Sequence, residues 1–330
     1  MSDSRLGCNN AFLTKDGAVL SIGSSVVRQT RDRGLELLRT FPGASRGVRS
    51  LFVARDGSIF ASPEGTQLPD SEKGLWRSAD RGRTWQRVLD LSGAPNPVAI
   101  WGLDADQKGC LYAGVYTTAP GARMAVIYAS SDCGEHWRSS YADLTGRHIH
   151  SIAVDSQTRV VYATVGDDFG IWKTRRIVRS DDCGYTWQPI ISDLPQVVPV
   201  VAAGKARLFG SDFSGRTELY RTTDDEKWTT VLSEPESLYF FWIRSDADAG
   251  RLLAGTVTGR CQEQARVYQS LDEGRSWNVF QRLDAPEHWD GTPCASNIQE
   301  SKIIILLRAR GTPQPPLVVD LDRRCAVLKP

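Results

Sequence analysis

The stretch "RSDDCGYTWQPI", Arg179 to Ile190, decides the fold because it has close copies along the chain. The pattern S/T-x-D-x-G-x-x-W recurs in full as "SADRGRTW", "SSDCGEHW", "SDDCGYTW" and "SLDEGRSW". Weaker relatives are "TRDRGLEL", "TTDDEKW" and "DLDRRCAV". The repeated aspartates stand at positions 32, 80, 132, 182, 224, 272 and 322. This spacing predicts seven units of roughly 47 residues, a period in the range of propeller blades.

Each unit carries the same pattern of strands before its box. A hairpin comes first, as in "SIAVDSQTRVVYAT", where polar residues supply the turn between two apolar runs. A third strand such as "VIYAS" then enters the box, and a fourth such as "TWQRVL" leaves it. No segment has helical periodicity. The sequence therefore predicts one all-β domain over residues 1–330, a seven-bladed β-propeller of four-stranded antiparallel blades with a box turn in each.

The box has a structural explanation. Its aspartate can accept hydrogen bonds from the backbone of its own turn, its glycine can adopt a positive φ, and its tryptophan can anchor the fourth strand. We therefore interpret the boxes as architecture rather than as a chemical site. The residues assigned this role are Asp80, Gly82, Trp85, Asp132, Gly134, Trp137, Asp182, Gly184, Trp187, Asp272, Gly274 and Trp277.

Composition excludes several classes of partner. The formal net charge is +1, with 40 basic and 39 acidic residues, so no global field would attract nucleic acid or a membrane. No basic segment with a long apolar run opens the chain, and we expect a soluble, cytoplasmic monomer. The seven cysteines lack C-x-x-C spacing and are expected as free thiols. Cys8 and Cys294 are the pair expected to approach each other when the ring closes, whereas Cys133 and Cys183 are expected to stay apart.

The repeated box resembles the Asp-box, or BNR, repeat of sialidases, other glycoside hydrolases, sortilin-type receptors and a photosystem assembly factor. The resemblance implies the propeller fold and, because these propellers host unrelated activities, does not fix one function. It also implies that ligands bind on the face opposite the box turns. A sialidase is not expected, because the early Arg-Ile-Pro-like motif is missing and sialidases have six blades. Asp-box glucanases place paired aspartates between two propellers, and this chain has length for one.

The long loops of the face opposite the boxes are "GVYTTAPGARMA", "VGDDFGIWKTRR" and "DAPEHWDGTPCAS". Long loops over the axis are where a propeller usually carries binding residues. We expect Asp168 or Asp212 as the general base, with His150 as a further catalytic residue. Trp101 and Trp242, on innermost strands, are interpreted as packing between blades. The residues expected to bind ligand are Tyr116, Arg123, His148, Trp172, Arg216 and Trp289.

Two function classes stay open. The first is an enzyme that acts on a carbohydrate or another polar small molecule by acid/base chemistry in an axial pocket. It needs no cofactor, because no phosphate loop, metal motif or serine nucleophile elbow is present. No metal is predicted, although a site built on His148 and His150 stays open. The second is a non-catalytic binding or assembly propeller that presents the same face to a protein or a glycan.

Overall fold

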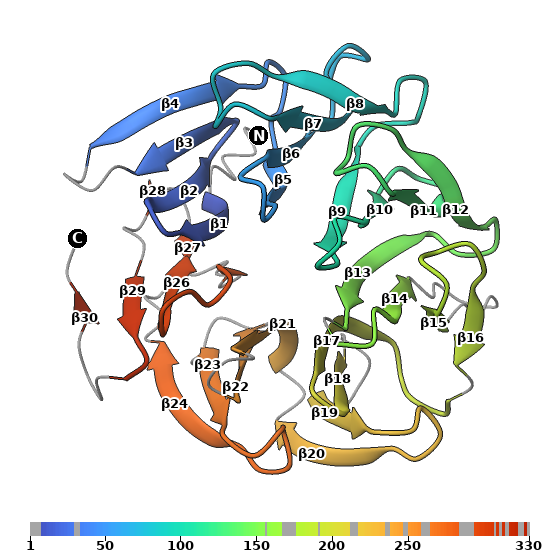
Figure 1. Cartoon of the computed structure of the whole chain (residues 1–330), viewed down its shortest axis with the longest axis vertical. Helices are drawn as coiled ribbons and strands as arrows, with labels where there is room; N and C mark the ends of the chain where they lie inside the picture. Colours follow the sequence, from blue (N-terminus) through green and yellow to red (C-terminus); the bar gives the residue numbers. More distant parts are fainter. Residues whose placement is uncertain are drawn as a thin grey trace.

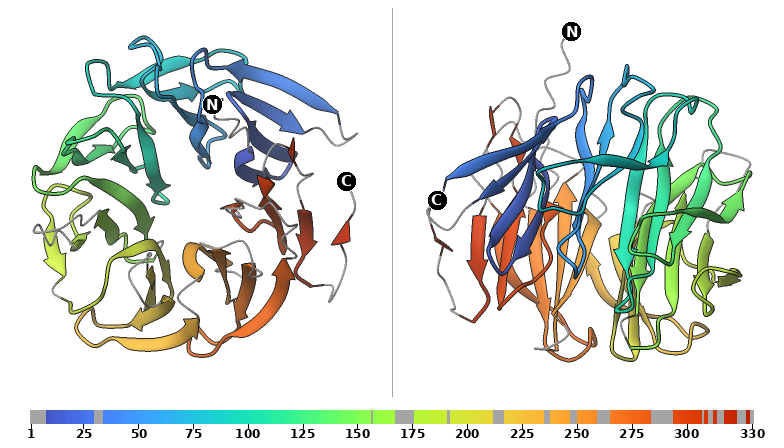
Figure 2. Two further views of the ribbon diagram at one scale, coloured as in Figure 1. Left: turned by 180° about the vertical axis from the view of Figure 1, so that it is seen from behind. Right: turned by 45° about the horizontal axis from the view of Figure 1, so that its top comes forward.

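The computed structural model consists of sheets arranged in a ring, with strands that run roughly along the ring axis (Figures 1 and 2). Among the described residues, no helix is long and apolar enough to cross a membrane. The residues that the structure describes are 8–29, 34–155, 157–166, 176–190, 192–211, 217–234, 238–246, 250–258, 265–283, 294–306, 308–309, 312–313, 317–322 and 327–328.

Six sheets are regular antiparallel blades, each made of four consecutive strands with the first strand nearest the axis. Blade 1 consists of β1 (Cys8–Thr14), β2 (Gly17–Ile22), β3 (Ser25–Gln29) and β4 (Leu35–Thr40). Blade 2 consists of β5 (Gly47–Val53), β6 (Ile59–Glu64), β7 (Gly74–Ser78) and β8 (Gln86–Asp90). Blade 3 consists of β9 (Val98–Ala105), β10 (Leu111–Thr117), β11 (Ala125–Ser130) and β12 (Arg138–Asp143).

The other three regular blades have the same order. Blade 4 consists of β13 (His148–Val154), β14 (Val161–Gly166), β15 (Arg176–Ser180) and β16 (Gln188–Ile190). Blade 5 consists of β17 (Val197–Ala203), β18 (Ala206–Ser211), β19 (Thr217–Thr222) and β20 (Thr229–Glu234). Blade 6 consists of β21 (Leu238–Asp246), β22 (Arg251–Thr258), β23 (Ala265–Ser270) and β24 (Asn278–Leu283).

The prediction of seven equivalent four-stranded blades is wrong, because the described part of the chain forms six regular ones. The chain after blade 6 forms a last, irregular sheet. Its first and last strands have two residues each, and a two-stranded hairpin interrupts it. The box of this unit keeps Asp322 but has neither the glycine nor the tryptophan that would anchor a long outer strand. The strands after blade 6 are β25 (Cys294–Ala295), β26 (Lys302–Leu306), β27 (Arg308–Ala309), β28 (Thr312–Pro313), β29 (Leu317–Asp320) and β30 (Val327–Leu328).

The irregular sheet lies between blade 6 and blade 1 and completes the ring. Ile303 and Ile305 of β26 pack in one apolar cluster with Trp242 of blade 6, and Ile304 packs with Leu20 of blade 1. The Asn297 side chain also pairs with the backbone of β1: it accepts from Leu13 N at 2.7 Å and donates to Leu13 O at 3.1 Å. Burial of apolar side chains between neighbouring sheets is what holds the ring together.

The full boxes share one set of hydrogen bonds. Asp182 accepts from Thr186 N at 2.8 Å, from Thr186 Oγ1 at 2.6 Å and from Ser180 Oγ at 2.9 Å. Gly184 follows with a φ of +75°, which explains the glycine. The residue before it, Cys183, is also left-handed, with a φ of +60°. The box turn therefore contains two successive left-handed residues, and the sequence pattern indicated one of them.

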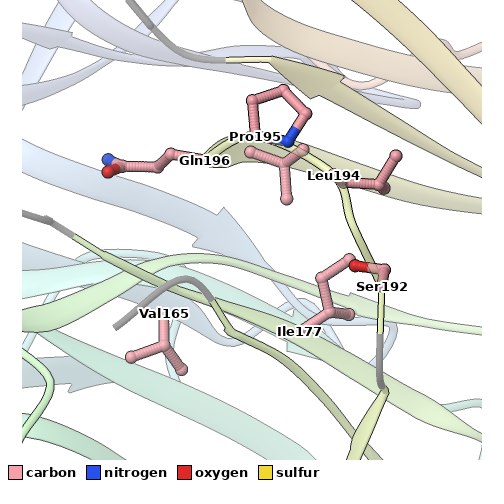
Figure 3. A pocket seen from close by; sticks show the side chains of 7 residues that line it. Val165, Ile177, Ser192, Leu194, Pro195 and Gln196 are labelled. Atoms are coloured by element: carbon pink, nitrogen blue, oxygen red, sulfur yellow. The ribbon is translucent and has the colours of Figure 1, made fainter. Parts of the chain in front are cut away.

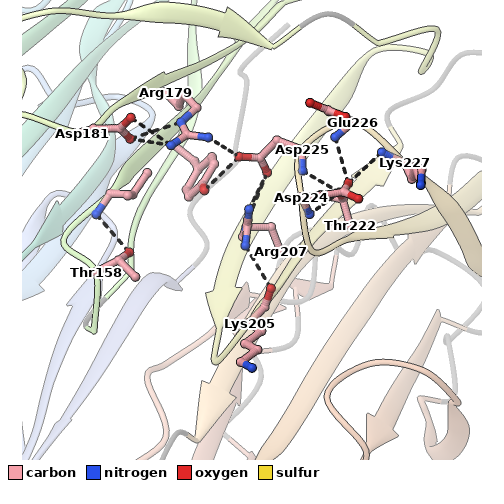
Figure 4. A network of polar contacts seen from close by, with 12 residues as sticks. Thr158, Arg179, Asp181, Lys205, Arg207, Thr222, Asp224, Asp225, Glu226 and Lys227 are labelled. Carbon is pink, nitrogen blue, oxygen red and sulfur yellow. Dashed lines mark hydrogen bonds and ion pairs between the residues drawn. The ribbon is translucent and has the colours of Figure 1, made fainter.

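The short box of blade 5 is held by a different device (Figure 4). Asp225 carboxylate oxygens accept from Arg179 Nη1 at 2.7 Å and from Arg207 Nε at 3.0 Å. Tyr162 Oη donates to the same carboxylate at 3.2 Å. Arg179 and Tyr162 belong to blade 4, so this buried carboxylate joins two blades where the box glycine is missing.

Candidate functional site at the axis

The innermost strands carry β-bulges at equivalent places. In blades 2, 3, 4 and 6 the pairing of the first two strands skips one residue of the innermost strand. The skipped residues are Arg49, Trp101, His150 and Phe241. A bulge re-aims a side chain that regular pleating would send elsewhere, and bulges occur often beside functional sites. We call these four residues, together with Tyr116 and His148, the axial cluster.

Trp101 is the centre of the axial cluster. Arg49 Cζ lies 4.1 Å from the centroid of the Trp101 ring and 4.3 Å from that of Tyr116. The Trp101 ring also approaches His150, with 5.6 Å between centroids, and Phe241, with 5.8 Å. Trp101 and Phe241 belong to blades 3 and 6, which are separated by two blades on one side of the ring. Aromatic rings therefore meet across the axis.

A buried carboxylate supports the Arg49 side chain. Glu64 stands at the end of β6 with 2% of its side chain exposed. Its carboxylate forms ion pairs with Arg49 Nη1 at 3.5 Å and with Arg46 Nη1 at 3.2 Å. Arg46 also donates to Thr118 Oγ1 at 2.9 Å. The carboxylate thus holds two guanidinium groups at the end of the axis opposite the boxes, where an oxygen-rich ligand would meet them.

His148 and His150 share a hydrogen bond within the axial cluster. The two Nε2 atoms are 2.7 Å apart, and His148 Nδ1 lies 2.6 Å from the carbonyl oxygen of Thr117. Because that carbonyl can only accept, Nδ1 of His148 carries a proton, and His150 Nε2 donates to His148 Nε2 in the neutral pair. Both side chains are buried, and the Tyr116 ring lies over His148 with 4.2 Å between centroids. The pair is a route for moving one proton between two rings.

Asp104 lies farther along β9, towards the box turns, and is a candidate general acid. It accepts hydrogen bonds from Val154 N and Ala105 N, both at 2.8 Å. Burial raises the pKa of Asp104 to about 6, against the lowering effect of these hydrogen bonds and of the Arg244 charge. A carboxyl group with this pKa can both donate and accept a proton near neutral pH.

The structure brings together three of the ligand-face residues that the sequence singled out: Tyr116, His148 and His150. Arg123 is exposed, and its Nη1 donates to Thr145 O at 3.0 Å. The reasoning from sequence missed Arg49, Glu64 and Phe241 and assigned Trp101 to packing. The other residues expected at the site lie outside the described part of the chain: Asp168, Trp172, Asp212, Arg216 and Trp289.

A separate shallow hollow lies between blades 4 and 5 (Figure 3). Its lining is mainly apolar and includes Val165, Ile177 and Leu194, with Ser192 and Gln196 as the polar members. It offers no titratable side chain, so it lacks the chemistry of the axial cluster.

No family model matches the chain. A xyloglucanase of Paenibacillus sp is 25% identical over 294 residues, which cover 83% of this chain and 24% of that protein. The chain therefore spans about a quarter of this curated relative. The xyloglucanase of Xanthomonas campestris has a similar structure, with a TM-score of 0.66, 17% identity, and coverage of 95% of this chain and 52% of that one.

Two further solved structures have different names. YCF48 bound to D1 peptide has a TM-score of 0.61 and 12% identity, and the match covers 93% of this chain and 91% of that one. The Hadza microbial sialidase Hz136 has a TM-score of 0.52 and 17% identity, with 90% and 72% covered. At these identities the likeness establishes the fold and leaves the activity open.

Proposed function

We propose that this chain, an Asp-box-like β-propeller distantly related to xyloglucanase, sialidase and YCF48 structures, binds a carbohydrate at the axial cluster. The observation that carries the proposal is the position of Arg49 against Trp101 and Tyr116 at the end of the axis opposite the boxes. All three side chains are partly exposed.

Sugar binding requires apolar ring faces for the C–H surface of the sugar and fixed polar groups for its hydroxyls. Trp101, Tyr116 and Phe241 supply the rings, and Arg46 and Arg49 supply guanidinium donors that Glu64 holds in place. The charges of the two arginines and Glu64 leave an excess of one positive charge. A neutral or weakly acidic glycan therefore suits this wall better than a cationic ligand.

Acid/base catalysis is the second candidate, and the hydrogen-bonded pair of His148 and His150 favours it. A pair that can shift one proton between two rings can donate a proton to, or accept one from, a ligand bound at the axial cluster. The sequence-based proposal that Asp168 or Asp212 acts as general base belongs to this candidate. Replacement of that residue by asparagine should then lower turnover by about 10²–10⁴ with the fold retained.

Isothermal titration with xyloglucan oligosaccharides, chosen because two relatives are named xyloglucanases, tests the proposal. Trp101→Ala should weaken binding at least tenfold, or about 1.4 kcal/mol. Tyr185→Ala is the matched control, because it also removes an aromatic ring stacked with an arginine, but on the box face; Arg138 Cζ lies 4.1 Å from its centroid. The control should bind as the parent does.

Equal affinity of Trp101→Ala and the parent would contradict binding at the axial cluster. Binding of an extended peptide in place of any glycan, lost in the same variant, would keep the site but replace the ligand class. Sugar release from a bound oligosaccharide by the parent and not by His150→Gln would favour the enzyme over the binding protein.

A further inference from the structure

A group of sulfur, carboxylate and guanidinium atoms lies at the box face, where blade 3 meets blade 4. Cys110 precedes β10 in blade 3, and Cys183 lies in the box turn of blade 4. Their Sγ atoms and a carboxylate oxygen of Asp106 all lie within 4.8 Å of one another. Seventy-two residues separate the two cysteines in sequence, so the fold rather than local spacing brings them together.

Arg159 links the three groups. Its Nη2 lies 2.7 Å from Asp106 Oδ2, 3.0 Å from Cys183 Sγ and 3.7 Å from Cys110 Sγ. The Asp106 carboxylate is fully buried within the protein, and it fixes the guanidinium, whose side chain is 29% exposed. A fixed guanidinium that donates to a sulfur stabilises the negative charge which that sulfur needs to act as a nucleophile.

The two thiols are not equivalent. Cys183 has the shorter contact with the cation. Burial raises the pKa of Cys110, with a further contribution from the Asp106 charge, so Cys110 stays a thiol. Both are partly exposed to solvent, so a small oxidant can reach them. An attacking sulfur beside a cation with a protonated partner within a few ångströms is the arrangement of a redox-active pair.

We propose that Cys183 and Cys110 form a reversible disulfide between blades 4 and 3 when the protein meets a hydroperoxide. With hydrogen peroxide, the Cys183 sulfur attacks one oxygen, the O–O bond breaks, and a sulfenic acid forms while the other oxygen departs as water; an organic hydroperoxide would release an alcohol in place of that water. The Cys110 sulfur then attacks the sulfenic sulfur, the S–O bond breaks, and a second water carries away the thiol proton. Two thiols are oxidised by two electrons, and one hydroperoxide is reduced.

The chain offers a matched control thiol. Cys133 stands in the box of blade 3 where Cys183 stands in the box of blade 4, and it has the same left-handed backbone, with a φ of +58° against +60°. Its sulfur is next to Gly109, and no described hydrogen bond joins it to a guanidinium. A reaction that depends on the box position alone would treat Cys133 and Cys183 alike, whereas the proposal separates them.

The experiment is a time course of the folded full chain with hydrogen peroxide, followed by alkylation of free thiols and peptide mapping. The expected product is a Cys110–Cys183 peptide pair that dithiothreitol separates. Cys133→Ser should leave its rate unchanged, and Arg159→Ala should slow it roughly three- to tenfold. Arg159→Lys, which keeps a cation, should lie between. In Cys110→Ser, a sulfenic-acid probe should label Cys183.

Several results would overturn the proposal. One is the absence of the linked peptide while both thiols stay free and the protein stays folded; another is equal reaction of Cys133. A rate for Arg159→Ala equal to that of the parent would remove the role of the cation. If both thiols resist alkylation without forming a disulfide, and a chelator restores their reaction, the group would instead be assigned to a bound metal ion.

Discussion

Arg49 and Trp101 stack across the boundary between blades 2 and 3, with 4.1 Å from the guanidinium carbon to the ring centroid, and each is the extra residue of a β-bulge. Arg49→Ala would remove this contact, the contact with Tyr116 and one of two cations that face buried Glu64. We expect the free energy of unfolding to fall by about 2–4 kcal/mol, measured by urea denaturation.

Two variants control this measurement. Arg49→Lys keeps a charge near Glu64 but loses the flat guanidinium, so its loss should be smaller than that of Arg49→Ala. Arg55→Ala removes an exposed arginine from the turn that follows the same strand, and its effect should stay within about 0.5 kcal/mol. If Arg49→Ala unfolds at the same urea concentration as the parent, the stack adds nothing to stability.

The sequence predicted the repeated blade well because its signals are local. Alternation, turn residues and the box fix each hairpin within a few residues, as the pairing of β13 with β14 illustrates. The irregular form of the last sheet was not predictable, because its weak box shares only Asp322 with the full boxes and the local pattern does not show how long its strands are. The bulges were also beyond sequence reasoning: whether Trp101 faces the axis or the blade interior depends on a one-residue shift in pairing, which the apolar pattern leaves open.

Asp225 and Asp181 allow a paired test, since Arg179 donates to both (Figure 4). The Asp225 side chain is 6% exposed and also binds Arg207, whereas that of Asp181 is 54% exposed. Asp225→Ala would leave two guanidinium groups at the boundary of blades 4 and 5 without their common carboxylate. We expect a loss of about 2–4 kcal/mol in the free energy of unfolding.

Asp181→Ala, by contrast, removes an exposed ion pair and should cost less than about 1 kcal/mol. Urea denaturation of both variants gives the comparison directly. Equal losses would mean that burial of the Asp225 network adds nothing and that the contacts with Arg179 alone decide stability.

Gly134 tests the box turn. Its φ is +82°, and an added Cβ would lie 2.6 Å from two ring carbons of Phe60, a fully buried side chain of blade 2. Gly134→Ala should therefore cost about 2–4 kcal/mol, the sum of backbone strain and overpacking. Gly57→Ala has a similar φ of +86° with nothing within 4 Å, and it should cost about 1–2 kcal/mol. A Gly134→Ala variant no less stable than Gly57→Ala would show that Phe60 gives way freely.

The box aspartates predict loss of stability in acid. Hydrogen bonds from the hydroxyl and then the backbone N–H of Thr84, Thr186 and Ser276 hold the pKa of Asp80, Asp182 and Asp272 at about 2. An unfolded aspartate titrates near about 4. Because the folded values are the lower ones, the contribution to stability is complete above pH about 4 and is lost as the pH falls towards about 2.

Melting temperature measured from pH 5 to pH 2 should follow this window. Asp182→Asn removes one titrating group that the box hydrogen bonds keep ionised, so it should make the fall shallower. A melting temperature that stays constant down to pH 2 would contradict the stabilising role of the box carboxylates.

Substitution of Gly166 tests whether the histidine pair contributes to function. It is the last residue of β14, and an added Cβ would lie 2.3 Å from Cε1 and 2.7 Å from Nε2 of His150. Gly166→Ala should push that ring away from His148 and break the hydrogen bond between the two Nε2 atoms. Nitrogen NMR of the imidazoles should register the change, and the free energy of unfolding should fall by about 1–3 kcal/mol.

Gly114→Ala is the matched control, because its Cβ would lie 2.5 Å from Cγ2 of Ile149, the residue beside His150 on β13. It should lower stability to a similar degree and leave the imidazole signals as they are. Both variants press a new methyl group against a residue of β13. A fall in glycan affinity or turnover confined to Gly166→Ala can therefore be assigned to the histidine pair. If the two variants bind and react alike, the histidine pair contributes only to packing, and ligand binding depends on Arg49, Trp101 and Tyr116.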